Sequence, residues 1–157
     1  FTEYFTSVLL KKILTPFGDG YVDLQSPAGL LNGVIVFNYD GSVYATDENR
    51  MLAEMKDFHF KMGHLDTDSY KSIFFSNKVL ESTNNWLNEG LAGCSECAFQ
   101  IYCGADPVLH WATQGDEYGY RPNSSFCNKN MEIIRYIFEL MDSDPSTEKI
   151  FSSWIHN

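Results

Sequence analysis

Long apolar runs are absent from this chain, and none approaches the ~18 consecutive residues that a membrane-spanning helix needs. The first residues, FTEYFTSVLLKKIL, mix charged and polar positions with apolar ones, unlike the continuous apolar stretch of a signal peptide. Positive charge is scarce too, because 11 Lys and Arg face 21 Asp and Glu, a net charge of −10. Phosphate backbones and anionic membranes would be repelled. We therefore expect a cytoplasmic protein with no nucleic-acid partner and no membrane partner.

Known catalytic signatures are also missing. No Ser-His-Asp set, phosphate-binding loop or paired-carboxylate motif stands out, and no internal repeat, linker or low-complexity tract divides the sequence. The 157 residues and their 44% hydrophobic content are sufficient for one domain with a core, so disulfides are not needed for folding. The chain begins at Phe1 with a helical pattern and without Met, which predicts a piece of a longer polypeptide.

Apolar periodicity predicts an α+β fold. The runs Val34–Tyr39 and Ser42–Ala45 flank Asp40-Gly41, a dipeptide typical of a tight β-hairpin turn. Tyr21–Ser26 is expected to form a short strand, and Asp47 to cap the helix that follows it in the sequence. Helices are predicted at residues 1–14, 48–55, 68–76, 78–88, 131–141 and 148–154.

Between Gly90 and Cys127 the periodicity is lost. So long a segment without secondary structure is uncommon in a compact domain, unless something other than an apolar core organises it. All 4 cysteines of the chain lie in this segment or at its border. Three of them fall within CSECAFQIYC, residues 94–103.

The spacing of these cysteines favours a metal centre. Cys94-x2-Cys97 places two thiolates on one turn of backbone, Cys103 can return after a short loop, and Cys127 can complete the set from a helix N-terminus. Four thiolates suit a tetrahedral zinc ion or a four-cysteine iron–sulfur cluster. The gap between the second and third cysteines is less usual for zinc and favours iron–sulfur. Buried free thiols and two disulfides are the alternatives, but neither explains the clustering.

The pattern C-x2-C-x5-C with a distant fourth cysteine, downstream of DGSVYATDE, resembles the SPASM domain. This is the C-terminal auxiliary-cluster domain of radical SAM enzymes that modify peptides and proteins. The segments GYVDLQSPAG, CSECAFQIYCGADPV, QGDEYGYRPNSSFC and IFSSWI are similar to the radical SAM maturase of His-Xaa-Ser peptide systems. The resemblance covers nearly the whole chain. It implies a SPASM/twitch-like fold with a small hairpin, flanking helices and a long cysteine-rich metal-binding loop.

The resemblance also implies a function. Residues 17–157 would form the auxiliary-cluster domain, and residues 1–16 a linking helix from a radical SAM barrel that is missing here. Cys94, Cys97, Cys103 and Cys127 would bind a [4Fe-4S] cluster that aids electron transfer or places a substrate peptide or protein, as in anaerobic sulfatase maturases. The C-x3-C-x2-C motif that serves S-adenosylmethionine cleavage in the barrel is absent from this sequence. The chain alone is therefore not expected to be active.

A structural zinc module that mediates a protein interaction is the alternative, and four thiolates also accept zinc in an aerobically prepared sample. A full SPASM domain resembles a two-cluster module. Where the ligands of its first cluster would fall, this chain has Ser26, Thr46 or Asp47, and Pro107. We therefore expect one centre, with Ser26 and Asp47 serving as turn and helix-cap acceptors.

Other polar residues between Gly90 and Cys127 are expected to have structural roles. His110 could be a ligand or an acid–base group, but four thiols already satisfy one centre. The loop carboxylates Asp106, Asp116 and Glu117 could bind a basic substrate segment, yet such residues are usually solvated or capping. Arg121 could donate to a cluster sulfide or a ligand thiolate, although a surface ion pair is the expected role.

Overall fold

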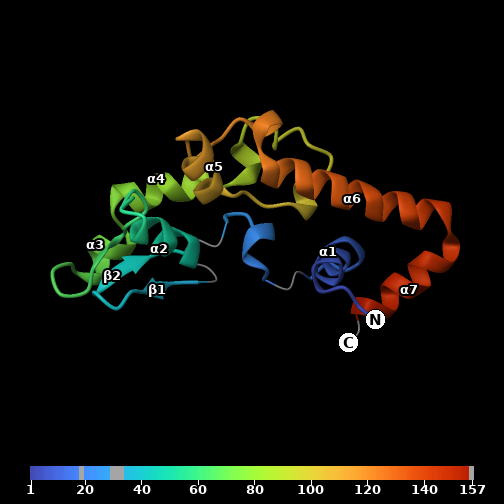
Figure 1. Ribbon diagram of the computed structural model, residues 1–157, viewed down its shortest axis with the longest axis horizontal. Coiled ribbons are helices and arrows are strands. Elements are labelled where there is room, and N and C mark those ends of the chain that lie inside the picture. The colour runs from blue at the N-terminus through green and yellow to red at the C-terminus, as the bar shows by residue number, and fades with distance from the viewer. Residues whose placement is uncertain (18–19, 29–33, 156–157) are drawn as a thin grey trace.

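The computed structural model describes residues 1–17, 20–28 and 34–155. Within them, helices and a small antiparallel sheet of order β1-β2-β3 confirm the α+β class. Figure 1 shows an elongated molecule with the sheet at one end and α1 and α7 at the other. No helix in the described ranges is long and apolar enough to cross a membrane. The elements are α1 (Tyr4–Leu14), η1 (Val22–Leu24), β1 (Val36–Phe37), β2 (Ser42–Tyr44), α2 (Asp47–Glu54), β3 (Gly63–His64), α3 (Tyr70–Phe74), α4 (Asn77–Asn85), η2 (Asn88–Gly90), η3 (Gln100–Tyr102), α5 (Pro107–Gln114), η4 (Arg121–Asn123), α6 (Ser125–Ser143) and α7 (Pro145–Ile155).

The predicted hairpin is confirmed, with shorter strands. β1 and β2 are antiparallel, and Phe37 lies opposite Val43. Gly41 in the turn has a φ of +85°, and a Cβ there would lie 2.8 Å from the Cε1 atom of His64. Only glycine fits this position without strain. His64 belongs to β3, which the sequence did not indicate and which pairs with the other edge of β2.

A first hydrophobic core joins the sheet end of the molecule to α2, α4 and α5. Trp86, which follows α4, is 1% exposed. The ring of Phe60 meets the Trp86 indole edge-on, with 5.7 Å between ring centroids. Leu52 of α2 and Val108 of α5 belong to the same cluster of buried residues. The helices predicted at 68–76 and 78–88 are confirmed as the shorter α3 and α4.

The start of α2 differs from the prediction. Thr46 is its N-cap, because the Thr46 side chain accepts a hydrogen bond from the backbone N–H of Asn49 at 3.3 Å. Asp47, the expected cap, is the first helical residue and forms an exposed ion pair with Arg50 at 2.8 Å. Both residues offer a side-chain oxygen. Only the backbone shows that the helix begins one residue after Thr46.

A second hydrophobic core lies at the opposite end, where α1 packs against α6 and α7 (Figure 1). Leu9 and Leu10 of α1 and Ile134 of α6 are fully buried in it. The predicted helices in all three places are confirmed. However, α6 begins at Ser125, well before the predicted start at residue 131. Cys127 therefore lies in the first turn of a helix, as its expected role requires.

Two expectations about irregular regions are wrong. The stretch 21–26 contains the 3-10 turn η1 instead of a strand. The segment 90–127 does contain regular structure, because α5 runs through it. Asp106 caps α5, and Pro107 occupies its first turn. This Asp-Pro pair is a recognised start signal that the sequence offered.

Changing Thr46 to Ala should lower the free energy of unfolding by about 1–2 kcal/mol, because the N–H of Asn49 loses its acceptor in a buried position. Changing Asp47 to Ala should cost about 0.5 kcal/mol or less, since its ion pair is exposed. Urea denaturation of both variants measures the difference. A larger loss for Asp47→Ala would contradict the assignment of the cap.

Candidate metal centre

The cysteine-rich segment from Leu91 to Cys103 lies between the two cores. Leu91 is buried in the first core, and Cys94 packs against that core. Farther along, Phe99 and Tyr102 pack against the second core. The segment is therefore anchored at both ends by apolar contacts, and its cysteines lie between them.

All four predicted ligands line one cavity at this junction. Cys94, Cys97 and Cys103 come from the segment and Cys127 from the first turn of α6. Each is a half-buried free thiol, so the structure contains neither of the alternative disulfides. Much of the remaining wall is apolar, with these side chains: Phe99, Met131 and Ile134.

The four thiols are not arranged as metal ligands. Among the described residues, no group of three or more His, Cys, Asp or Glu side chains is placed to hold a metal ion. The cavity measures about 30 Å³, room for little more than a water molecule. The thiol of Cys127 hydrogen-bonds to the sulfur of Met131 at 3.7 Å. Binding a centre would therefore require the cysteine side chains to turn and the cavity to widen, so the metal site remains a prediction.

Burial favours the protonated form of three of these thiols. Burial raises the pKa of Cys94, Cys103 and Cys127, and that of Cys103 reaches about 11. The positive charge of Arg121 opposes this effect by lowering the pKa of Cys94 and Cys127. The backbone N–H of Gly104 does the same for Cys103 through a hydrogen bond. A metal bound here would displace protons from the thiols, which makes its affinity pH-dependent.

A buried asparagine organises the cysteine-rich segment. The side-chain amide of Asn88, which is 2% exposed, donates to the carbonyl oxygens of Gln100 and Cys103, each at 3.2 Å. Its oxygen accepts from the Gln100 side chain at 3.1 Å. Sequence reasoning missed Asn88, because no spacing or motif marks a residue that acts by bonding to a distant backbone.

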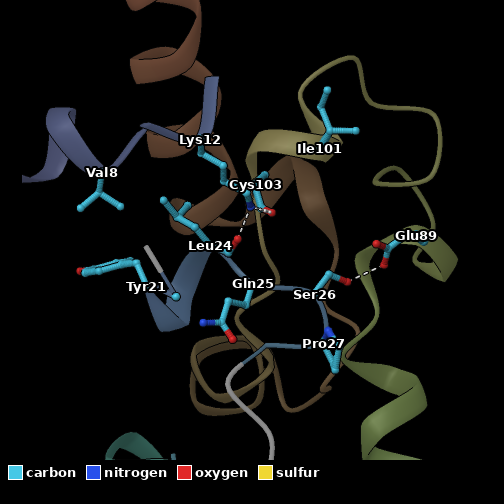
Figure 2. A pocket seen from close by; sticks show the side chains of 11 residues that line it. Val8, Lys12, Tyr21, Leu24, Gln25, Ser26, Pro27, Glu89, Ile101 and Cys103 are labelled. Carbon is cyan, nitrogen blue, oxygen red and sulfur yellow. Dashed lines mark hydrogen bonds between the residues drawn. The ribbon is translucent and has the colours of Figure 1, made fainter. Parts of the chain in front are cut away.

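Cys103 also borders a second cavity, of about 330 Å³, which Figure 2 shows between α1, η1 and the cysteine-rich segment. Lys12 from α1 donates to the carbonyl oxygens of Leu24 and Cys103, the latter at 3.1 Å. On the other side, the hydroxyl of Ser26 donates to the carboxylate of Glu89.

Ser26 has a structural role, but not only the local one expected. Its oxygen accepts from the backbone N–H of Asn88 at 3.1 Å and so joins the stretch after η1 to η2, which precedes the cysteine-rich segment. Pro107, another position where a second cluster would need a ligand, lies in the first turn of α5. The expectation of a single centre therefore stays a prediction.

His110 and Arg121 are both buried. His110 is fully buried, and its Nε2 atom lies 2.7 Å from the hydroxyl of Ser124, the N-cap of α6. The same hydroxyl oxygen accepts from the N–H of Cys127 at 3.1 Å. The Nη1 atom of Arg121 lies 3.2 Å from Nδ1 and 3.3 Å from Nε2 of this imidazole, and therefore over the face of the ring. His110 thus helps to position the cap that holds Cys127, and it does not line the cysteine cavity.

The surface ion pair expected for Arg121 is wrong, because the side chain is only 8% exposed. Of the three carboxylates, Asp106 caps a helix and Asp116 is solvated outside any helix, both as expected. Asp106 accepts from the N–H of Leu109, and Asp116 from that of Tyr118. Glu117 instead is a partly buried link between distant segments: it accepts from the Trp86 indole at 3.0 Å and lies 2.6 Å from His59.

Comparison with known proteins gives no relative. No protein-family model matches the chain, and neither a curated protein nor a solved structure matches it. The functional argument is therefore carried by the residues and their geometry.

Changing Asn88 to Asp should destabilise the metal-free protein by about 3 kcal/mol, because a carboxylate would replace the amide that donates to two carbonyl oxygens. Asn84→Asp is the matched control: Asn84 is exposed on α4 and should change stability by no more than about 0.5 kcal/mol. Chemical denaturation measures both. Equal losses would contradict the role given to Asn88.

The pKa of His110 is lowered to about 4, first by burial and then by the charge of Arg121. The ordinary pKa of histidine is 6.5, so between pH 6.5 and about pH 4 the unfolded chain binds a proton at His110 that the folded chain does not. This histidine should therefore remove about 1.4 kcal/mol of stability for each pH unit below 6.5. The loss should be absent in His110→Asn. The unfolding free energies of the parent protein and of His110→Asn should therefore converge as the pH falls through this range. Parallel pH profiles of the two proteins would contradict the assignment.

Proposed function

We propose that this chain is the auxiliary-cluster domain of a radical SAM peptide maturase and that its four cysteines hold one [4Fe-4S] cluster. The observation that carries the proposal is the shared cavity. Residues 94, 97 and 103 reach it from an irregular segment and Cys127 from a helix start, although they are far apart in the sequence. The resemblance of the sequence to the SPASM domain supplies the kind of centre.

The surroundings of the cavity fit such a centre. Thiolates are the soft ligands that iron–sulfur clusters select. The first turn of α6 places the positive end of a helix dipole beside Cys127, which favours a thiolate there. The guanidinium of Arg121 has buried nitrogen atoms, Nε and Nη2, without a hydrogen-bond partner among the described residues.

When bound, the cluster would supply one-electron transfer or a fixed surface for the substrate. The chain itself contributes the ligands, the apolar enclosure and the hydrogen bonds of Asn88 and Lys12 that hold the Cys103 carbonyl. We assign the substrate peptide to the larger cavity in Figure 2, because Cys103 forms part of its wall. Lys12 and Glu89 give that cavity both a positive and a negative group.

Anaerobic reconstitution with iron and sulfide tests the proposal. About four iron and four sulfide per chain are expected. Serine at any of the four cysteine positions should reduce the iron content strongly. Ser95→Ala, an exposed change inside the same segment, should leave it unchanged.

Colourless protein with one zinc per chain after anaerobic expression would overturn the cluster and favour the zinc module. About eight iron per chain would instead mean a second cluster with ligands other than cysteine.

A further inference from the structure

The larger cavity in Figure 2 contains a lysine without a carboxylate partner. Lys12 of α1 is partly buried and lines this cavity, and no carboxylate of the described residues forms an ion pair with it. Its ammonium group donates to the carbonyl oxygens of Leu24 and Cys103, which leaves one of its three N–H groups without an acceptor in the described part of the chain. A charge that is partly removed from water favours an anionic ligand beside it.

The opposite charge lies on another side of the same cavity. Figure 2 shows the carboxylate of Glu89, from η2, accepting a hydrogen bond from the hydroxyl of Ser26. The oxygen of that hydroxyl accepts in turn from the backbone N–H of Asn88 at 3.1 Å. The carboxylate is therefore held in place by the fold and can receive a positive group of a ligand.

The rest of the wall suits a short piece of peptide. The side-chain amide of Gln25 lines the cavity and makes no hydrogen bond with the described residues. An amide offers both a donor and an acceptor, as a peptide group does. Val8 and Ile101 add apolar surface. The volume of about 330 Å³ is at the lower end of the range of ligand pockets, roughly 300–1,000 Å³.

We propose that this cavity binds a short peptide segment through a carboxylate, which accepts from the third N–H of Lys12, while a neighbouring basic group of the segment pairs with Glu89. The role of this segment as substrate rests on the proposed function. The net charge of −10 repels a purely acidic ligand, and a basic group beside the carboxylate offsets that repulsion. Because a lysine acts as a point charge, the carboxylate can belong to an acidic side chain or to a C-terminus.

Titration of the full chain without added metal, followed by the amide chemical shifts of the protein, tests the site. Acetyl-Asp-Lys-amide should shift signals around the cavity and bind about tenfold more tightly than acetyl-Asn-Lys-amide, because only the former offers a charged acceptor. Nα-acetyl-lysine, whose carboxylate is terminal, separates the two sources. Tighter binding of this compound than of acetyl-Asp-Lys-amide would assign the site to a peptide C-terminus.

Variants locate the two charges. Lys12→Met keeps the aliphatic chain and should abolish the preference for the Asp peptide over the Asn peptide. Because Lys12 also holds two backbone carbonyl oxygens, Glu89→Gln is a second variant. It should weaken binding of both lysine-containing dipeptides and keep the preference for Asp. Glu96→Gln, an exposed change outside the cavity, should match the parent protein.

The outcomes separate this inference from the proposed function. Equal binding of the Asp and Asn peptides by the parent protein, or no binding of any of the three compounds, would overturn the carboxylate site whether or not the chain takes up a cluster. A chain that prefers the carboxylate but takes up no iron–sulfur cluster in anaerobic reconstitution would keep the site and overturn the proposed function.

Discussion

The structure depends on the segment between Leu91 and Cys103 packing against two hydrophobic cores at once. Leu91 and Cys94 belong to the core at the sheet end, whereas Phe99 and Tyr102 belong to the core of α1, α6 and α7. Three cysteines lie on this segment, and the fourth lies in the first turn of α6. The packing of both cores therefore decides whether the four thiols meet. A change that separates the cores would separate the ligands.

Polar contacts make this junction specific. Asn88 and Lys12 both donate to the carbonyl oxygen of Cys103 and so hold the turn that presents this thiol. Gly104 follows directly and packs so closely on η1 that a Cβ there would lie 2.2 Å from the carbonyl oxygen of Asp23. These contacts fix the backbone of the segment around Cys103. What a metal would change is the side-chain direction and protonation of the thiols.

The sequence predicted what local patterns determine. The hairpin turn, most helices and the convergence of the cysteines on one place follow from turn chemistry, apolar periodicity and ligand spacing. It did not indicate β3, whose two residues carry no alternation, or Asn88, whose bonds reach the backbone of a distant turn. Asp106 followed by Pro107 is a helix start signal in the sequence, but the prediction placed Asp106 in a loop. The burial of Arg121 was out of reach, because only tertiary packing places a charge inside the protein.

The central claim is that these four thiols hold one all-sulfur iron centre. Iron K-edge X-ray absorption of the anaerobically reconstituted chain tests it most directly, because the spectrum reports the atoms around each iron. We predict sulfur as the only neighbour in the first shell, with iron–iron scattering behind it, as in a cubane cluster. Nitrogen or oxygen neighbours without iron–iron scattering would contradict the claim.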